Sequence, residues 1–185
     1  MQSRILVAAF LFLICNSIVG AKTAAADYKQ LTKVDQLPVA LDSDFQFRKT
    51  KLFSLGDIPG GSAAKRFQTG RPGPKDPSVG FESAYRLYGA VTELDKRQRY
   101  GNYFDFFWRA RRPATITIRL EYQQEKLRTL TQAREITYPN AHGHIKTEFA
   151  VIGDDYLNDG RVLAWRCVLI EKGRIVAEDR SYLWR

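Results

Sequence analysis

Apolar and polar residues alternate with a period of two over much of this chain, most clearly in its second half. This spacing is typical of β-strands, whose successive side chains point to opposite faces of a sheet. Residues 103–109 and 115–122 are the clearest such runs, and we predict a strand for each. Their even positions hold large apolar residues that we expect in the core: Phe104, Phe106, Trp108, Ile116, Ile118, Leu120 and Tyr122.

Six further runs are expected to be strands: 45–55, 81–91, 129–138, 145–152, 162–170 and 175–184. Arg111-Arg112-Pro113 predicts a turn, and Pro139 is expected to end the strand before it, because proline cannot donate a hydrogen bond within a sheet. Gly173 favours a tight hairpin between the last two strands. Little of the chain shows a helical period, so almost no helix is expected.

Strands at this density, joined by turn residues, predict an all-β fold. We expect an antiparallel sandwich of two sheets, of the immunoglobulin or fibronectin type III kind, over residues 44–185. A small β-barrel is the alternative. Residues 27–43 are polar and weakly patterned, and they are expected to form a flexible lead-in to this single domain.

The first 26 residues have the composition of a secretory signal peptide. Arg4 precedes an apolar run over residues 5–14, and small residues at 24–26 suit cleavage after Ala26. Removal of this segment leaves Cys167 as the sole cysteine, for which a buried and unreactive thiol is expected. One cysteine and no remaining Asn-x-Ser/Thr sequence favour export to a bacterial periplasm, or secretion.

Charge narrows the choice of partner. The chain has a formal net charge of +9, and without the two basic residues of the signal region 27 basic residues face 20 acidic ones. A basic surface favours an anionic partner, such as a cell-envelope polymer or an acidic protein face. Export makes nucleic acid the least favoured partner, and any contact with a membrane is expected to be peripheral.

Two groups of residues are candidate binding surfaces. The first is a loop rich in Gly and Pro over residues 56–80, a length that is usually functional or disordered; it carries Lys65, Arg66, Arg71 and Lys75. The second is a cluster of aromatic and basic residues that offers rings for stacking and guanidinium groups for carboxylates or phosphates: Tyr103, Phe107, Arg109, Arg111 and Arg112. Alternatively, the loop is only a linker that joins two strands, and the aromatic residues of the cluster fill the core instead of binding a partner.

No pattern in the chain predicts a catalytic residue, a metal ion or a cofactor. His142 and His144 lack a third ligand nearby, and the acidic loop with Asp154, Asp155 and Asp159 fails the spacing of a helical calcium loop. Glu82 and Asp105 remain an open pair for glycoside hydrolysis, which depends on a spatial separation that sequence does not give.

These observations lead to three functional hypotheses. The first is an exported, non-catalytic binding module for an anionic envelope polymer or a protein partner. The second is a secreted accessory enzyme that acts on glycans or another hydrolysable substrate. The third is a structural envelope subunit that assembles by pairing edge strands.

Overall fold

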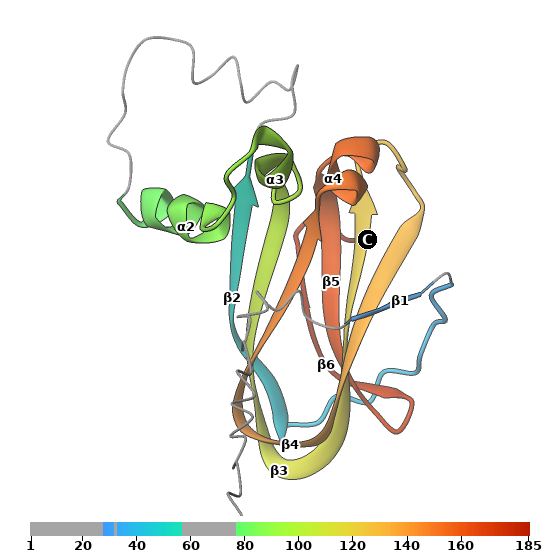
Figure 1. Ribbon diagram of the computed structural model, residues 1–185. Helices are drawn as coiled ribbons and strands as arrows, with labels where there is room; N and C mark the ends of the chain where they lie inside the picture. The colour runs from blue at the N-terminus through green and yellow to red at the C-terminus, as the bar shows by residue number, and fades with distance from the viewer. Residues whose placement is uncertain (1–27, 32, 57–76) are drawn as a thin grey trace, which may run out of the picture.

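The computed structural model describes residues 28–31, 33–56 and 77–185 (Figure 1). Six strands form one antiparallel sheet: β1 (Lys29–Leu31), β2 (Phe45–Leu55), β3 (Gly101–Gln124), β4 (Thr131–Ile152), β5 (Val162–Glu171) and β6 (Arg174–Arg180). Their order is β1-β4-β3-β5-β6, and β2 also pairs with β3. The predicted antiparallel, mostly β architecture is therefore confirmed.

The long hairpin of β3 and β4 organises the sheet. Its pairing runs from Gly101 opposite Ile152 to Gln123 opposite Thr131, with register shifts between Ala110 and Ile116. The sheet bends there, so that its two parts rise side by side (Figure 1). We call β2 with residues 101–110 and 143–152 the first limb, and β1, β5 and β6 with residues 114–124 and 131–141 the second limb.

The expected turn at residues 111–113 and the expected strand end at Pro139 are both wrong. Pro113 lies inside β3 and Pro139 inside β4, at the irregular part of the ladder. A bulge tolerates proline because some backbone N–H groups there have no partner to donate to. The two prolines therefore mark a bend in a continuous hairpin.

The core lies between the two limbs. Even-numbered residues of β3 face it on both sides of the bend, and Phe104, Phe106 and Trp108 are buried as predicted. One hydrogen-bonded sheet continues through both limbs, so the expected pair of separate immunoglobulin-like sheets is not confirmed.

Three short helices occur within the described residues: α2 (Pro77–Leu87), α3 (Glu93–Arg97) and α4 (Asp154–Asp159). The strand expected over 81–91 is wrong, because α2 occupies most of this range. Phe81 and Tyr85 are four residues apart, which places them on one side of the helix, and Tyr88 lies in the turn that follows. Their alternation with polar residues had indicated a strand equally well.

The chain segment that precedes β2 contacts the second limb at two places. β1 pairs with residues 133–135 of β4, and Val39 forms an isolated bridge to Ile175.

The predicted hairpin between β5 and β6 is confirmed. Lys172 and Gly173 have φ values of 48° and 75°, the positive values that a tight primed turn needs at both central positions.

Candidate functional site

The outer face of the first limb carries a row of charged and aromatic side chains. Odd-numbered residues of β3 point to this face, and the register places Lys49 and Lys146 on either side of Phe107. One step along, Lys51 and Glu148 flank Asp105. We call the following set the outer strip: Lys49, Lys51, Asp105, Phe107, Arg109, Lys146 and Glu148.

Phe107 is the aromatic centre of the outer strip. Its ring is half-buried, and the ammonium groups of Lys51 and Lys146 each lie 5.7 Å from the ring centroid. Cations at this distance are attracted to the negative face of an aromatic ring. The ring therefore helps to hold two positive charges at the surface.

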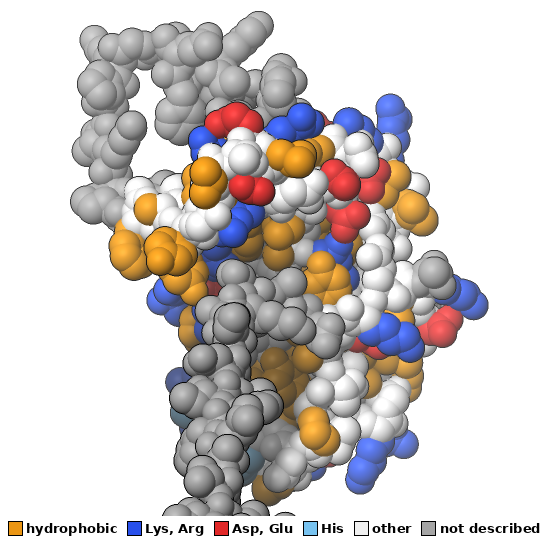
Figure 2. Space-filling view, in the orientation of Figure 1, with side chains coloured by type: hydrophobic (Ala, Val, Ile, Leu, Met, Phe, Trp, Pro, Cys, Tyr) orange, Lys and Arg blue, Asp and Glu red, His pale blue; other side chains and the backbone are white. Residues whose placement is uncertain are grey.

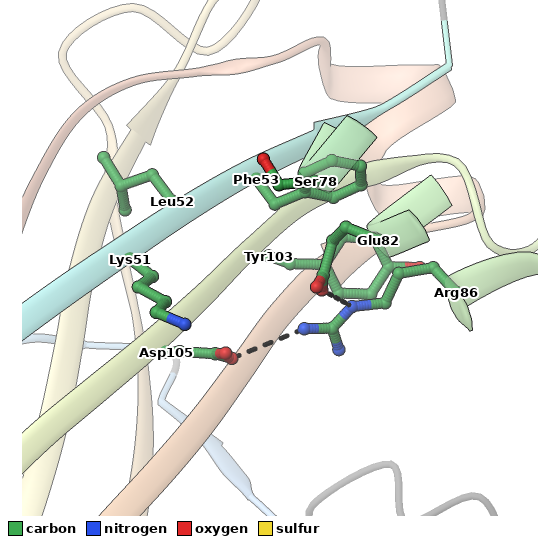
Figure 3. Close-up of a pocket in the computed structure, with 8 residues that line it drawn as sticks. All are labelled: Lys51, Leu52, Phe53, Ser78, Glu82, Arg86, Tyr103 and Asp105. Carbon is green, nitrogen blue, oxygen red and sulfur yellow. Dashed lines mark hydrogen bonds and ion pairs between the residues drawn. The ribbon is translucent and has the colours of Figure 1, made fainter. Parts of the chain in front are cut away.

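Helix α2 covers the end of the outer strip near Asp105 and encloses a pocket of about 350 Å³. Figure 3 shows the eight residues that line it: Lys51, Leu52, Phe53, Ser78, Glu82, Arg86, Tyr103 and Asp105. The guanidinium of Arg86 lies 4.4 Å from the centroid of the Tyr103 ring. Arg86 thus forms the centre of the pocket wall.

Arg86 contacts three carboxylates, one on α2 itself and two on the sheet, and the latter two hold the helix to the sheet. Its Nε lies 2.8 Å from Glu82 Oε1, and its other nitrogens lie 3.5 Å from Asp105 Oδ1 and 3.6 Å from Glu148 Oε2. Burial alone lowers the pKa of Arg86, but the bond to Glu82 and the three negative charges outweigh this and raise it. The guanidinium therefore stays charged and fixes the helix.

Glu82 and Asp105, an open pair in the sequence, do meet at this pocket. Both contact Arg86, and Asp105 also lies 3.2 Å from Lys146 Nζ. A general acid for hydrolysis needs a carboxyl group that keeps its proton, which an apolar setting favours. Here each carboxylate already has a cationic partner, an arrangement typical of a structural ion-pair cluster.

The structure distributes the predicted binding residues among different environments. Tyr103 is 7% exposed beneath Arg86, and its hydroxyl donates to the carbonyl of Arg99 at 2.5 Å. Arg109 and Arg111 are exposed and make no ion pair with any described residue. Lys65, Arg66, Arg71 and Lys75 lie outside the described residues.

Arg112 is partly exposed, but its guanidinium is already paired with other residues of the protein. It forms a bidentate pair with Glu171 at 2.6 and 2.7 Å, reaches Asp42 Oδ2 at 3.0 Å and lies over the ring of Phe45. These contacts join the bend of β3 to the β5–β6 hairpin and to the segment before β2. Arg112 therefore stabilises the bend rather than offering a free charge.

We expect Arg112→Gln to lower stability more at pH 7 than at pH 3. The backbone N–H of Asp44 and then Arg112 lower the pKa of Asp42, and Arg112 lowers that of Glu171, from ordinary values of 3.8 and 4.5. Carboxyl groups with lowered pKa values stabilise the fold above their ordinary pKa, and this contribution is lost as the pH falls through the lowered values.

Urea unfolding at the two pH values measures this difference. The urea midpoints of wild type and Arg112→Gln should differ at pH 7, and the difference should be smaller at pH 3. Arg174→Gln, an exposed change in the same hairpin, serves as the control. An equal loss at both pH values would show that Arg112 stabilises the fold by packing alone.

The acidic and histidine candidates do not assemble a metal site. Among the residues that the structure describes, no group of three or more His, Cys, Asp or Glu side chains is placed to hold an ion. Asp154, Asp155 and Asp159 lie on α4, and Asp155 is paired with Arg134. The free thiol of Cys167 is buried, as expected.

The seam between β2 and β6 bears on the hypothesis of edge-strand assembly. A groove of about 630 Å³ lies there. Thr50 Oγ1 donates to Asp179 Oδ2 across it at 2.5 Å, and the Asp42 N–H donates to the carbonyl of Val176 at 2.9 Å. An added strand would have to break these links, so the seam is a poor acceptor.

Sequence reasoning missed Lys49, Lys51, Lys146 and Arg86. Lys49 and Lys51 are two residues apart in a predicted strand, which was a sign that they share a face. Nothing in the sequence placed Lys146 beside them, because strand register decides that contact.

Comparison of the chain with protein-family models, with curated proteins and with solved structures finds no match. No helix in the described ranges is both long enough and apolar enough to span a bilayer. The site itself therefore carries the functional argument.

Proposed function

We propose that this chain is an exported, non-catalytic binding module that holds an anionic polymer of the cell envelope on the outer strip. Export rests on the predicted signal peptide over residues 1–26. The observation that carries the proposal is a surface of cations without carboxylate partners: Lys49, Arg109 and the neighbouring Arg111 make no ion pair with a described residue.

The second limb provides the contrast. On its outer face Arg119 lies 2.5 Å from Glu135, and Arg166 lies 2.7 Å from the buried Glu121. These cations are neutralised within the protein. Lys49 and Arg109 on the first limb have no such partner among the described residues, and an unpaired cation favours binding of an anion.

The chemistry of the outer strip suits a polymer with repeated carboxylate or phosphate groups. Arginine binds such groups through two parallel hydrogen bonds, and the Phe107 ring offers an apolar surface between the charges. Positions 105 to 109 of β3 span roughly 13 Å at the rise of an extended strand. This length lets several charges of one extended chain bind together.

In this proposal the two limbs act as the two layers of a sandwich. They enclose one core, as facing sheets do, and leave an outer face free for binding. An immunoglobulin-like arrangement stays a prediction about architecture, and the binding proposal does not depend on it.

Charge reversal tests the proposed site. Lys49→Glu combined with Arg109→Glu should weaken binding to alginate, a carboxylated polysaccharide, by roughly tenfold at low salt. Wild-type binding should also fall with added salt, because exposed charges are screened. Co-sedimentation or calorimetry with alginate measures both effects, and uncharged dextran gives the background.

The matched control makes the same change of net charge elsewhere. Arg174→Glu combined with Arg180→Glu alters two exposed residues of β6 and should leave alginate binding intact. If both double variants lose affinity equally, only net charge matters and the outer strip is not the site. If neither loses affinity, the proposal is wrong.

The same samples also test the alternative hypothesis that the protein is a glycan-active enzyme. Release of new reducing ends from alginate by the wild type, lost in Glu82→Gln, would assign hydrolysis to the pocket under α2. We expect no release, because Arg86 contacts both carboxylates.

A further inference from the structure

Helix α2 presents an aromatic face that no described residue covers. Phe81, Tyr85 and Tyr88 are 73%, 64% and 83% exposed; Phe81 and Tyr85 lie about one turn apart on the helix, and Tyr88 lies in the turn that follows it. Two more exposed apolar residues, Val91 and Leu94, follow in the connection to α3 and in α3 itself. Figure 2 shows apolar side chains gathered on the outside of α2. A cluster of this kind usually marks an interaction surface.

The opposite side of α2 is anchored, so the aromatic face is held outward. Arg86 is bound to Glu82 on its own helix and to Asp105 and Glu148 on the sheet. Arg99 donates to the backbone carbonyls of Arg86 and Tyr88 at the end of the helix. These contacts fix the helix while leaving its aromatic side chains in solvent.

Helix α2, which carries the aromatic face, and the outer strip lie on the same side of the sheet. Ser78, Glu82 and Arg86 of α2 line one pocket with Lys51 and Asp105, so the helix lies directly over the end of the strip. Aromatic side chains on a helix beside free cations are the combination that binds the surface of an anionic bilayer. The rings enter the interface, and the cations bind lipid phosphates.

We propose that this protein docks on the surface of an anionic lipid bilayer, with the aromatic face of α2 in the interface and the outer strip on the headgroups. This inference rests on the proposed function, because the same strip supplies the charge. A helix that projects from the sheet (Figure 1) fits a deformable lipid surface. The tyrosine hydroxyls would stay at headgroup level while the rings enter the apolar region.

Vesicle binding tests the inference. The protein beginning at Asp27 should co-sediment with phosphatidylcholine vesicles containing about a third phosphatidylglycerol, and weakly with phosphatidylcholine alone. Phe81→Ser/Tyr85→Ser/Tyr88→Ser should lower the partition coefficient about tenfold or more. The matched control, Leu130→Ser/Tyr182→Ser/Leu183→Ser, removes three exposed apolar side chains elsewhere and should bind like the wild type.

A fluorescent label locates the contact. In the chain that begins at Asp27 the remaining thiol, Cys167, is fully buried, and burial raises its pKa well above the usual value. An environment-sensitive dye on Tyr88→Cys therefore labels one position. Its emission should shift to shorter wavelength on anionic vesicles, whereas the same dye on Tyr182→Cys should not respond.

The outcomes separate the two proposals. Wild-type binding to alginate without binding to vesicles would overturn the bilayer inference and leave the polymer proposal standing. Vesicle binding that survives the serine triple, with no response at position 88, would also overturn it. A dimer in solution that the serine triple dissociates would show that a second copy covers the face, again against the inference. No binding to either probe would overturn both proposals.

Discussion

Replacement of Trp108 by alanine should lower the free energy of unfolding by about 4 kcal/mol, the loss typical of a buried aromatic residue. Trp108 is 1% exposed and lies in the core cluster between the limbs. Its ring meets that of Tyr138 edge-on with centroids 5.6 Å apart, and its Nε1 donates to Thr147 Oγ1 at 3.0 Å. The substitution leaves a cavity and removes one of the two hydrogen bonds of the Thr147 hydroxyl, which keeps its bond to the Tyr138 hydroxyl.

Urea unfolding followed by circular dichroism measures this loss. Trp108→Phe keeps most of the volume and should cost much less, about 1 to 2 kcal/mol. Trp184→Ala removes the same side chain from a partly buried site beside Arg166, outside the core cluster, and should cost less than Trp108→Ala, about 1 to 2 kcal/mol. Equal losses in Trp108→Ala and Trp184→Ala would show that the limbs do not enclose a common core.

Loss of the carboxylate of Asp155 should destabilise the protein by about 2 to 3 kcal/mol, because it leaves a buried positive charge without its partner. Arg134 is 1% exposed and lies within the second limb, where its guanidinium binds Asp155 on α4 and donates to Tyr28 Oη at 2.8 Å. It also lies 4.4 Å from the Tyr28 ring centroid. One side chain thus links β4, α4 and Tyr28, the residue before β1.

A double variant distinguishes charge from packing. Arg134→Met combined with Asp155→Ala removes both charges and should recover much of the stability lost in Asp155→Ala. Asp159→Ala, on the same helix but without an ion pair to a described residue, should change unfolding by less than about 0.5 kcal/mol. A double variant less stable than Asp155→Ala would contradict the proposed role of the buried charge.

Strand β3 contributes both to the core that stabilises the fold and to the proposed binding surface. Trp108 and Phe107 are neighbours on one strand and point to opposite faces, so burial of the first fixes the exposure of the second. The outer strip therefore rests on a rigid strand rather than on a loop. Binding surfaces built in this way keep their charges at fixed spacing.

Sequence signals for the helices were present but weak. Thr92 and Asp95 form a capping box at the start of α3, and Gly89 with a φ of 81° follows the end of α2. Such caps mark helix ends in a sequence. The alternation around Phe81 and Tyr85 fitted a strand as well as a helix, so local pattern alone gave the wrong element.

The amino-acid sequence by itself determined the β-rich class, the inward residues of β3 and the hairpin at Gly173, because alternation and turn chemistry are local properties. The predictions of export and of an anionic partner also come from the sequence. Tertiary structure decided the continuous bend at Pro113, the engagement of Arg112 and the assembly of the outer strip. Those features depend on strand register and long-range ion pairs, which join residues far apart in the chain and leave no local pattern.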